Sequence, residues 1–137
     1  MRKIYFDMDG TIANLYKGEW LADLMAENTR PYEIADRLVE ESVLEELVNA
    51  GYELGIISWL AKNGSKEYNK AVRHAKREWL KENYPNIHFT EIHIVKYGTP
   101  KYRVANVKCQ ILVDDEEPNR KAWNGYAIEP KDLEKLF

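Results

Sequence analysis

The sequence has a single cysteine, Cys109, and this scarcity excludes a fold held together by internal disulfides. Cys109 lies in the apolar run KCQILVDD, where we expect it to pack as a small core residue. A strand interior is a poor environment for a reactive thiolate, so we do not expect it to act as a nucleophile. Histidine is also scarce, and His74, His88 and His93 lack the spacing of metal ligands. The sequence therefore does not indicate cysteine or histidine chemistry.

Long hydrophobic runs and a strong excess of one charge are missing as well. No apolar stretch approaches the about 20 residues that a membrane span needs, so we expect no membrane partner. The formal net charge of -3 does not indicate a surface built to bind nucleic acid, although the end of a polynucleotide stays open as a partner. The 137 residues contain no repeat or flexible linker, so we expect a single domain over residues 1–137. The chain begins directly with a strand pattern, and we expect a cytoplasmic location.

Short β-rich segments alternate with helical patterns along the chain, which is typical of an α/β fold. Ser42 and Glu45 form a capping-box pattern that predicts the start of one helix, and Pro100 predicts the start of another. Strands are expected over residues 3–7, 53–59, 89–95, 109–115 and 126–128. Helices are expected over residues 42–51, 65–82 and 131–137, with two short ones between residues 20 and 40 separated near Pro31. The alternation predicts a parallel sheet flanked by helices, as in Rossmann-like folds.

Polar residues follow three of the expected strands at the point where each one ends. Asp7 and Asp9 come after the first, Ser58 lies near the end of the second, and Asp114 and Asp115 close the fourth. The carboxyl ends of parallel strands meet at one edge of a sheet, so we expect these side chains to converge. Gly10 allows the backbone to turn sharply after the first pair. Converging carboxylates repel one another unless a cation compensates them, and an all-oxygen site suits Mg²⁺ bound to a phosphorylated substrate.

The segments DMDGT and ILVDD, with Ser58 and a lysine between them, resemble the four motifs of the haloacid-dehalogenase-like (HAD) phosphohydrolases. The resemblance covers residues 3 to about 125 and implies a HAD core with a Mg²⁺-dependent phosphatase activity. It implies that Asp7 is the nucleophile that becomes an aspartyl-phosphate, and that Asp9 is the general acid and base. It also implies that the Asp9 carbonyl is a metal ligand and that Ser58 donates a hydrogen bond to a phosphate oxygen. Asp7, Asp114 and Asp115 would hold the Mg²⁺.

Three lysines, Lys96, Lys101 and Lys108, lie between Ser58 and the acidic pair and are candidates for the lysine motif. We choose Lys101, because it follows a Thr-Pro helix start from which its charge can reach a phosphate. Lys108 is expected to precede a strand, and Lys96 to lie in a loop. Lys96 remains the alternative.

Residues 13–40 are expected to form a small helical insert over the site. Such a short insert resembles the small caps of the deoxyribonucleotidase-like members of the family, or members with almost no cap. The first resemblance implies a phosphate monoester substrate, in particular a nucleoside monophosphate. Tyr16, Trp20 and Tyr32 in the insert are candidates to stack on a nucleobase, and Trp59 is a candidate to border the substrate. A phosphate on a polynucleotide or protein is an alternative substrate, and a non-catalytic binding or regulatory protein is an alternative function.

Two further polar residues have two readings each. Thr11 is either a site residue or a helix cap, and Asn119 either orients Asp115 or caps the helix that follows the acidic pair.

Overall fold

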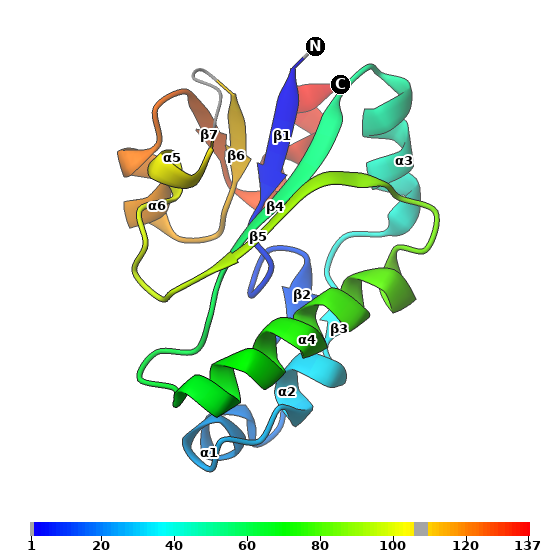
Figure 1. Ribbon diagram of the computed structural model, residues 1–137. Helices are drawn as coiled ribbons and strands as arrows, with labels where there is room; N and C mark the ends of the chain where they lie inside the picture. Colours follow the sequence, from blue (N-terminus) through cyan, green and yellow to red (C-terminus); the bar gives the residue numbers. More distant parts are fainter. Residues whose placement is uncertain (1, 106–109) are drawn as a thin grey trace.

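The computed structural model describes residues 2–105 and 110–137 and contains a sheet of five strands, all parallel (Figure 1). The strands lie in the order β5, β4, β1, β6, β7, with β1 in the centre. Their bounds are β1 Lys3–Phe6, β4 Glu53–Trp59, β5 Phe89–Val95, β6 Ile111–Val113 and β7 Tyr126–Ile128. The predicted α/β fold with a parallel sheet is therefore confirmed. Cys109 and Lys108 lie outside the described residues.

Helices connect the strands, as the alternating pattern predicted. Their bounds are α1 Trp20–Met25, α2 Arg30–Glu33, α3 Glu41–Asn49, α4 Lys66–Asn83, α5 Lys101–Val104 and α6 Glu117–Ala122, with a 3₁₀ helix, η1, at Pro130–Leu136. The long helix α4 begins at Ser65, whose Oγ accepts a hydrogen bond from the backbone N–H of Tyr68 at 3.1 Å. None of the helices in these residues is long and apolar enough to cross a membrane.

Three details of the helix predictions are wrong. The capping box at Ser42 and Glu45 is absent: α3 begins one residue earlier, at Glu41. Glu41 accepts hydrogen bonds from Asn86 N and Nδ2, both at 3.0 Å, and this tertiary contact anchors the helix start. The break predicted near Pro31 is wrong as well: Pro31 lies in the first turn of α2, which ends at Glu33, and the break lies between Met25 and Arg30. The terminal segment forms a 3₁₀ helix rather than an α-helix.

Alternate residues of each strand point to opposite faces of the sheet, and helices cover both faces. Ile4 and Phe6 of β1 point into the larger core, where they pack with residues of α3, α4 and η1. Tyr5 points to the other face and packs against Trp123, which follows α6, with a ring-centroid distance of 5.9 Å. The central strand is therefore buried on both sides, and the residues that follow it emerge at the sheet edge.

Residues 13–40, between β1 and α3, form an insert that is not helical throughout, whereas the sequence had suggested a helical one. It contains a short antiparallel pair, β2 Ala13–Asn14 and β3 Asp36–Arg37, with α1 and α2 between the two strands. In Figure 1, α1 and α2 lie beyond the carboxyl ends of the strands, next to the first half of α4. Tyr68 of α4 donates a hydrogen bond from its hydroxyl to the carbonyl of Asn28 at 3.0 Å, which fastens the insert to the body.

Candidate active site

The turn that follows β1 determines where the first two acidic residues lie. The N–H groups of Thr11, Ile12 and Ala13 all donate to the carbonyl of Met8, at 2.9 to 3.1 Å, so the chain reverses sharply. Gly10 has φ +82°, and a Cβ atom built there would lie 2.3 Å from Asp115 Oδ2. A glycine is thus required both by the backbone conformation and by the close approach of the acidic pair.

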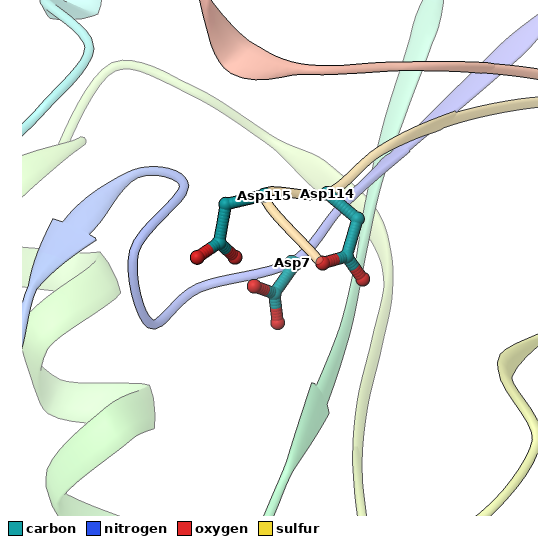
Figure 2. Close-up of side chains that lie close together, drawn as sticks. All are labelled: Asp7, Asp114 and Asp115. Carbon is teal, nitrogen blue, oxygen red and sulfur yellow. The ribbon is translucent and has the colours of Figure 1, made fainter. Parts of the chain in front are cut away.

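Three carboxylates converge at the carboxyl edge of the sheet. Asp7, Asp114 and Asp115 each place an oxygen within 4.8 Å of the others, and Figure 2 shows the three side chains turned toward one another. Their meeting follows from the register of β1 and β6, in which Phe6 pairs with Val113 and Asp7 N donates to Val113 O at 3.0 Å. The segments DMDGT and ILVDD thus become neighbours, although Thr11 of the first and Asp115 of the second are 104 positions apart in the chain. Carboxylates at this spacing form a set of hard oxygen donors for a divalent cation.

Lys101, the lysine chosen from the sequence, lies among these carboxylates. Its Nζ donates to Asp7 Oδ1 at 2.8 Å and to Asp114 Oδ2 at 2.7 Å, and the residue is 4% exposed. Burial alone would lower the pKa of Lys101, but the charges of Asp7 and Asp114 outweigh it and raise the pKa. Lys96, the alternative, is exposed in the loop after β5. Lys101 is therefore the lysine that compensates the negative charge of the cluster.

Thr11 and Asn119 support the carboxylates from two sides. Thr11 Oγ1 lies 3.1 Å from Asp7 Oδ2 and 3.2 Å from Asp115 Oδ1, and it accepts a hydrogen bond from Asp115 N at 3.1 Å. No described helix starts at Thr11, so its reading as a helix cap is wrong. Asn119 Nδ2 donates to Asp114 Oδ2 at 3.1 Å, and the residue lies inside α6. Asn119 thus orients Asp114, and neither of its predicted roles holds.

Burial and mutual repulsion make the acidic pair hard to ionise. Partial burial of its carboxyl group and the charges of Asp7 and Asp114 raise the pKa of Asp115 to about 7. Burial and the charge of Asp7 also raise the pKa of Asp114, against the attraction of Lys101. A bound cation would reverse these effects, because it favours the ionised form of every ligand.

Asp9 and Ser58 belong to a second group of contacts, next to the carboxylate cluster. Lys76 of α4 donates from Nζ to Asp9 Oδ2 at 2.8 Å, to Ser58 Oγ at 2.7 Å and to the carbonyl of Trp59 at 2.7 Å. Ser58 is fully buried, and Lys76 is 1% exposed. Burial raises the pKa of Asp9, while the charge of Lys76 lowers it. The Asp9 carboxylate is not part of the set of oxygens formed by Asp7 and the acidic pair.

Lys76 was not among the site residues predicted from the sequence. Its signal is present, however, because Lys76 lies one helical turn after Val72, next to Ala75, on the face of α4 that was expected to be apolar. A lysine on a buried helical face needs a buried acceptor for its charge. Such a position could have been marked as a partner for the carboxylates at the edge of the sheet.

A cavity of about 610 Å³ opens above both groups of residues. Asp7, Asp9 and Lys101 lie on its lining. Its walls carry six aromatic side chains, Tyr16, Trp20, Tyr32, Trp59, Tyr68 and Tyr97. Two edge-to-face pairs, Tyr16 with Trp20 and Trp59 with Tyr97, each have ring centroids 4.9 Å apart. All four aromatic residues selected from the sequence thus line the cavity that Asp7 and Asp9 also line.

The cavity combines a charged floor with walls suited to a flat or apolar group. Comparison with known proteins adds no assignment: the sequence matches no family model, and no curated protein matches it. The chemistry of this site therefore has to be argued from its own residues.

Proposed function

We propose that the protein is a Mg²⁺-dependent hydrolase of phosphate monoesters that works through an aspartyl-phosphate at Asp7, in the manner of the HAD enzymes. The observation that carries this proposal is the position of Asp7. It is shared between Lys101 and the acidic pair, and it lines the cavity. A carboxylate that lies within a cation-binding set and also accepts from a lysine is arranged to meet a phosphoryl group, whose charge both the cation and the lysine can offset.

The residues present fit a magnesium ion. Asp7, Asp114 and Asp115 would hold it, together with the Asp9 carbonyl that the resemblance implies. Each of the three would supply a carboxylate oxygen, the hard type of donor that Mg²⁺ prefers, and these oxygens lie within 4.8 Å of one another. When bound, the ion offsets the repulsion among the carboxylates and draws charge from a phosphate oxygen.

The chain's own groups supply the remaining steps. An oxygen of Asp7 attacks phosphorus, the bond to the ester oxygen breaks, and Asp9 gives its proton to that oxygen, so the alcohol leaves. Asp9 then takes a proton from a water molecule that attacks the phosphorus of the aspartyl-phosphate, which releases phosphate and restores Asp7. The raised pKa of Asp9 supports its role as a proton donor, because a carboxyl group must hold a proton before it can donate one.

Lys101 is suited to contact the transferred phosphate. An ammonium group has three N–H bonds, and two of those of Lys101 are directed to Asp7 and Asp114. Within the residues that the structure describes, the third has no hydrogen-bond acceptor, so it can donate to a phosphate oxygen, and Lys101 lies on the cavity lining.

The aromatic walls favour an ester with a flat organic group, and we propose a nucleoside monophosphate as the substrate. Base-aromatic stacking is worth about 1–3 kcal/mol per base in proteins that use it, which is enough to decide between a nucleotide and a sugar phosphate.

The test is a turnover assay with a panel of phosphate esters, with Mg²⁺ and with excess chelator. We expect hydrolysis only with Mg²⁺, a higher kcat/KM for nucleoside monophosphates than for sugar phosphates, and a mass increase of one phosphoryl group on the enzyme but not on Asp7→Asn. A phosphorylated oligonucleotide and a phosphopeptide complete the panel, and preference for either would reassign the substrate. Failure to hydrolyse any ester would leave the binding or regulatory alternative.

A further inference from the structure

Lys76 carries an ammonium group that is enclosed by protein atoms. The residue is 1% exposed, and its Nζ donates to a carboxylate, a hydroxyl and a backbone carbonyl, which belong to Asp9, Ser58 and Trp59. The ring of Tyr32, from the insert, lies over the same nitrogen at 5.2 Å from its centroid. Burying an ammonium group is costly unless it is fully paired, and here all three N–H bonds have acceptors within the protein.

Lys76 and Lys101 therefore differ in what they can do. Lys101 uses two N–H bonds within the protein and lines the cavity, whereas Lys76 uses three and is not among the described residues that line it. A phosphate oxygen could receive a hydrogen bond from Lys76 only if one of its three protein acceptors were given up.

We propose that Lys76 is a positioning residue, which holds Asp9 and Ser58 in their working orientations and does not touch the substrate. This inference rests on the proposed hydrolase function. Lys76 holds Oδ2 of Asp9, which leaves Oδ1 to exchange a proton with the leaving group and with water. Because Ser58 Oγ accepts a hydrogen bond from Lys76, its own proton is directed away from the lysine.

The anchoring of α4 supports this role. Val72 and Trp79, on the same helical face, are buried, and Trp79 Nε1 donates to the carbonyl of Ala35 at 2.7 Å. The helix thus packs against residues of the sheet and is also hydrogen-bonded to the insert. This packing fixes the position of the Lys76 nitrogen, and a residue that orients others needs such a fixed position.

A double-mutant cycle tests the proposal, with Lys76→Met, Asp9→Asn and the double variant compared in steady-state kinetics. Lys76→Met keeps the length of the side chain without its charge, and Lys70→Met, at an exposed site on the same helix, is the matched control. We expect kcat to fall by about 10- to 100-fold in Lys76→Met, as is typical when an outer-shell partner is removed, with little change in KM. If Lys76 acts mainly through Asp9, adding Lys76→Met to Asp9→Asn should lower kcat much less than Lys76→Met does in the wild-type protein, and the small remaining loss would come from Ser58.

Other results would overturn the proposal. A raised KM with unchanged kcat, or effects that multiply in the double variant, would mean that Lys76 contacts the phosphate itself. Wild-type turnover by Lys76→Met would defeat the proposal while leaving the proposed function intact. An inactive wild-type protein would defeat the proposed function first.

Two further measurements apply if Lys76→Met does not fold. Lys76→Arg keeps the positive charge, so this variant should fold. Its planar guanidinium cannot place three donors around one point, so kcat should fall while KM stays unchanged. Urea unfolding of Asp9→Asn, Lys76→Arg and their double variant, without Mg²⁺, should show coupling between the two sites, and additive effects would refute the pairing whatever the activity.

Discussion

Asp115→Asn should make the metal-free protein more stable at alkaline pH. In the folded chain, partial burial and the charges of Asp7 and Asp114 raise the pKa of Asp115 from 3.8 to about 7. A carboxyl group whose pKa is higher in the folded state binds its proton more tightly there than in the unfolded chain. Its contribution therefore lowers stability as pH rises from about 4, and the penalty is complete above about 7. Asparagine removes this penalty, and its side-chain oxygen can still accept from Thr11.

The size of the effect follows from the shift in the pKa of Asp115 and from the exposure of this residue to solvent. A shift of about 3 pKa units corresponds to about 4 kcal/mol without screening, but Asp115 is an exposed residue. Solvent screening reduces the contribution of exposed charges several-fold, so we expect about 1 kcal/mol at pH 8. For a domain of this size, that gain raises Tm by about 3–5 °C.

The assay is thermal and urea unfolding in excess chelator from pH 4 to 9. The advantage of Asp115→Asn should be present at pH 8 and disappear toward pH 4. With Mg²⁺ the wild-type protein should become more stable than the variant. A Mg²⁺ concentration 100-fold above Kd stabilises the wild-type protein by about 2.7 kcal/mol, and it stabilises the variant by less. Glu117→Gln, which removes an exposed charge that pairs with Lys121, is the matched control and should change little. Stability at or below the wild-type value at pH 8 without metal would refute the reasoning.

The remaining predictions concern the same edge of the sheet. Asp114→Asn should destabilise the metal-free protein although the pKa of Asp114 is raised too, because this variant leaves the buried ammonium group of Lys101 with one charged partner fewer; unchanged or higher stability would mean that the bond between Lys101 and Asp114 contributes nothing. Gly10→Ala should cost about 1–3 kcal/mol of stability and weaken Mg²⁺ binding measured by calorimetry, because φ is +82° and the new Cβ collides with a carboxylate; normal affinity would contradict this. Asp9→Asn should keep Mg²⁺ affinity but lower kcat by about 10²- to 10⁴-fold, and a loss of affinity alone would reassign the residue. Ca²⁺ should restore activity poorly after chelation, because its larger and looser shell misplaces the nucleophile, and equal rates with the two ions would argue against a Mg²⁺ site. Trp20→Ala should raise KM for a nucleoside monophosphate more than for a small aryl phosphate, and equal changes would remove the stacking role.

Local sequence patterns were sufficient to predict the strands and main helices of this fold and most of the polar residues at the edge of its sheet. Alternating and helical periodicity located the five strands and the main helices, since burial of one face imposes those periods on the sequence. The convergence of Asp7 with Asp114 and Asp115 could also be foreseen, because parallel strands present their carboxyl ends at one edge. Lys101 was found from a local feature, the Thr-Pro start of its short helix.

Contacts between distant segments could not be found in this way. The start of α3 is displaced from the capping box at Ser42 by the hydrogen bonds between Glu41 and Asn86, which are 45 positions apart. The capping pattern describes only what a helix can do with its own residues, and a tertiary partner with equally good hydrogen bonds can displace it.

The order of the strands and the partners of Lys76 were decided by the tertiary structure alone. Periodicity shows which face of α4 is buried, but not the angle and register at which the helix crosses the end of the sheet. That packing brings the nitrogen of Lys76 to Asp9, 67 positions away, and to Ser58, 18 positions away. Hydrogen bonds require placement within a few tenths of an ångström, and such placement arises only when all the side chains between helix and sheet pack together.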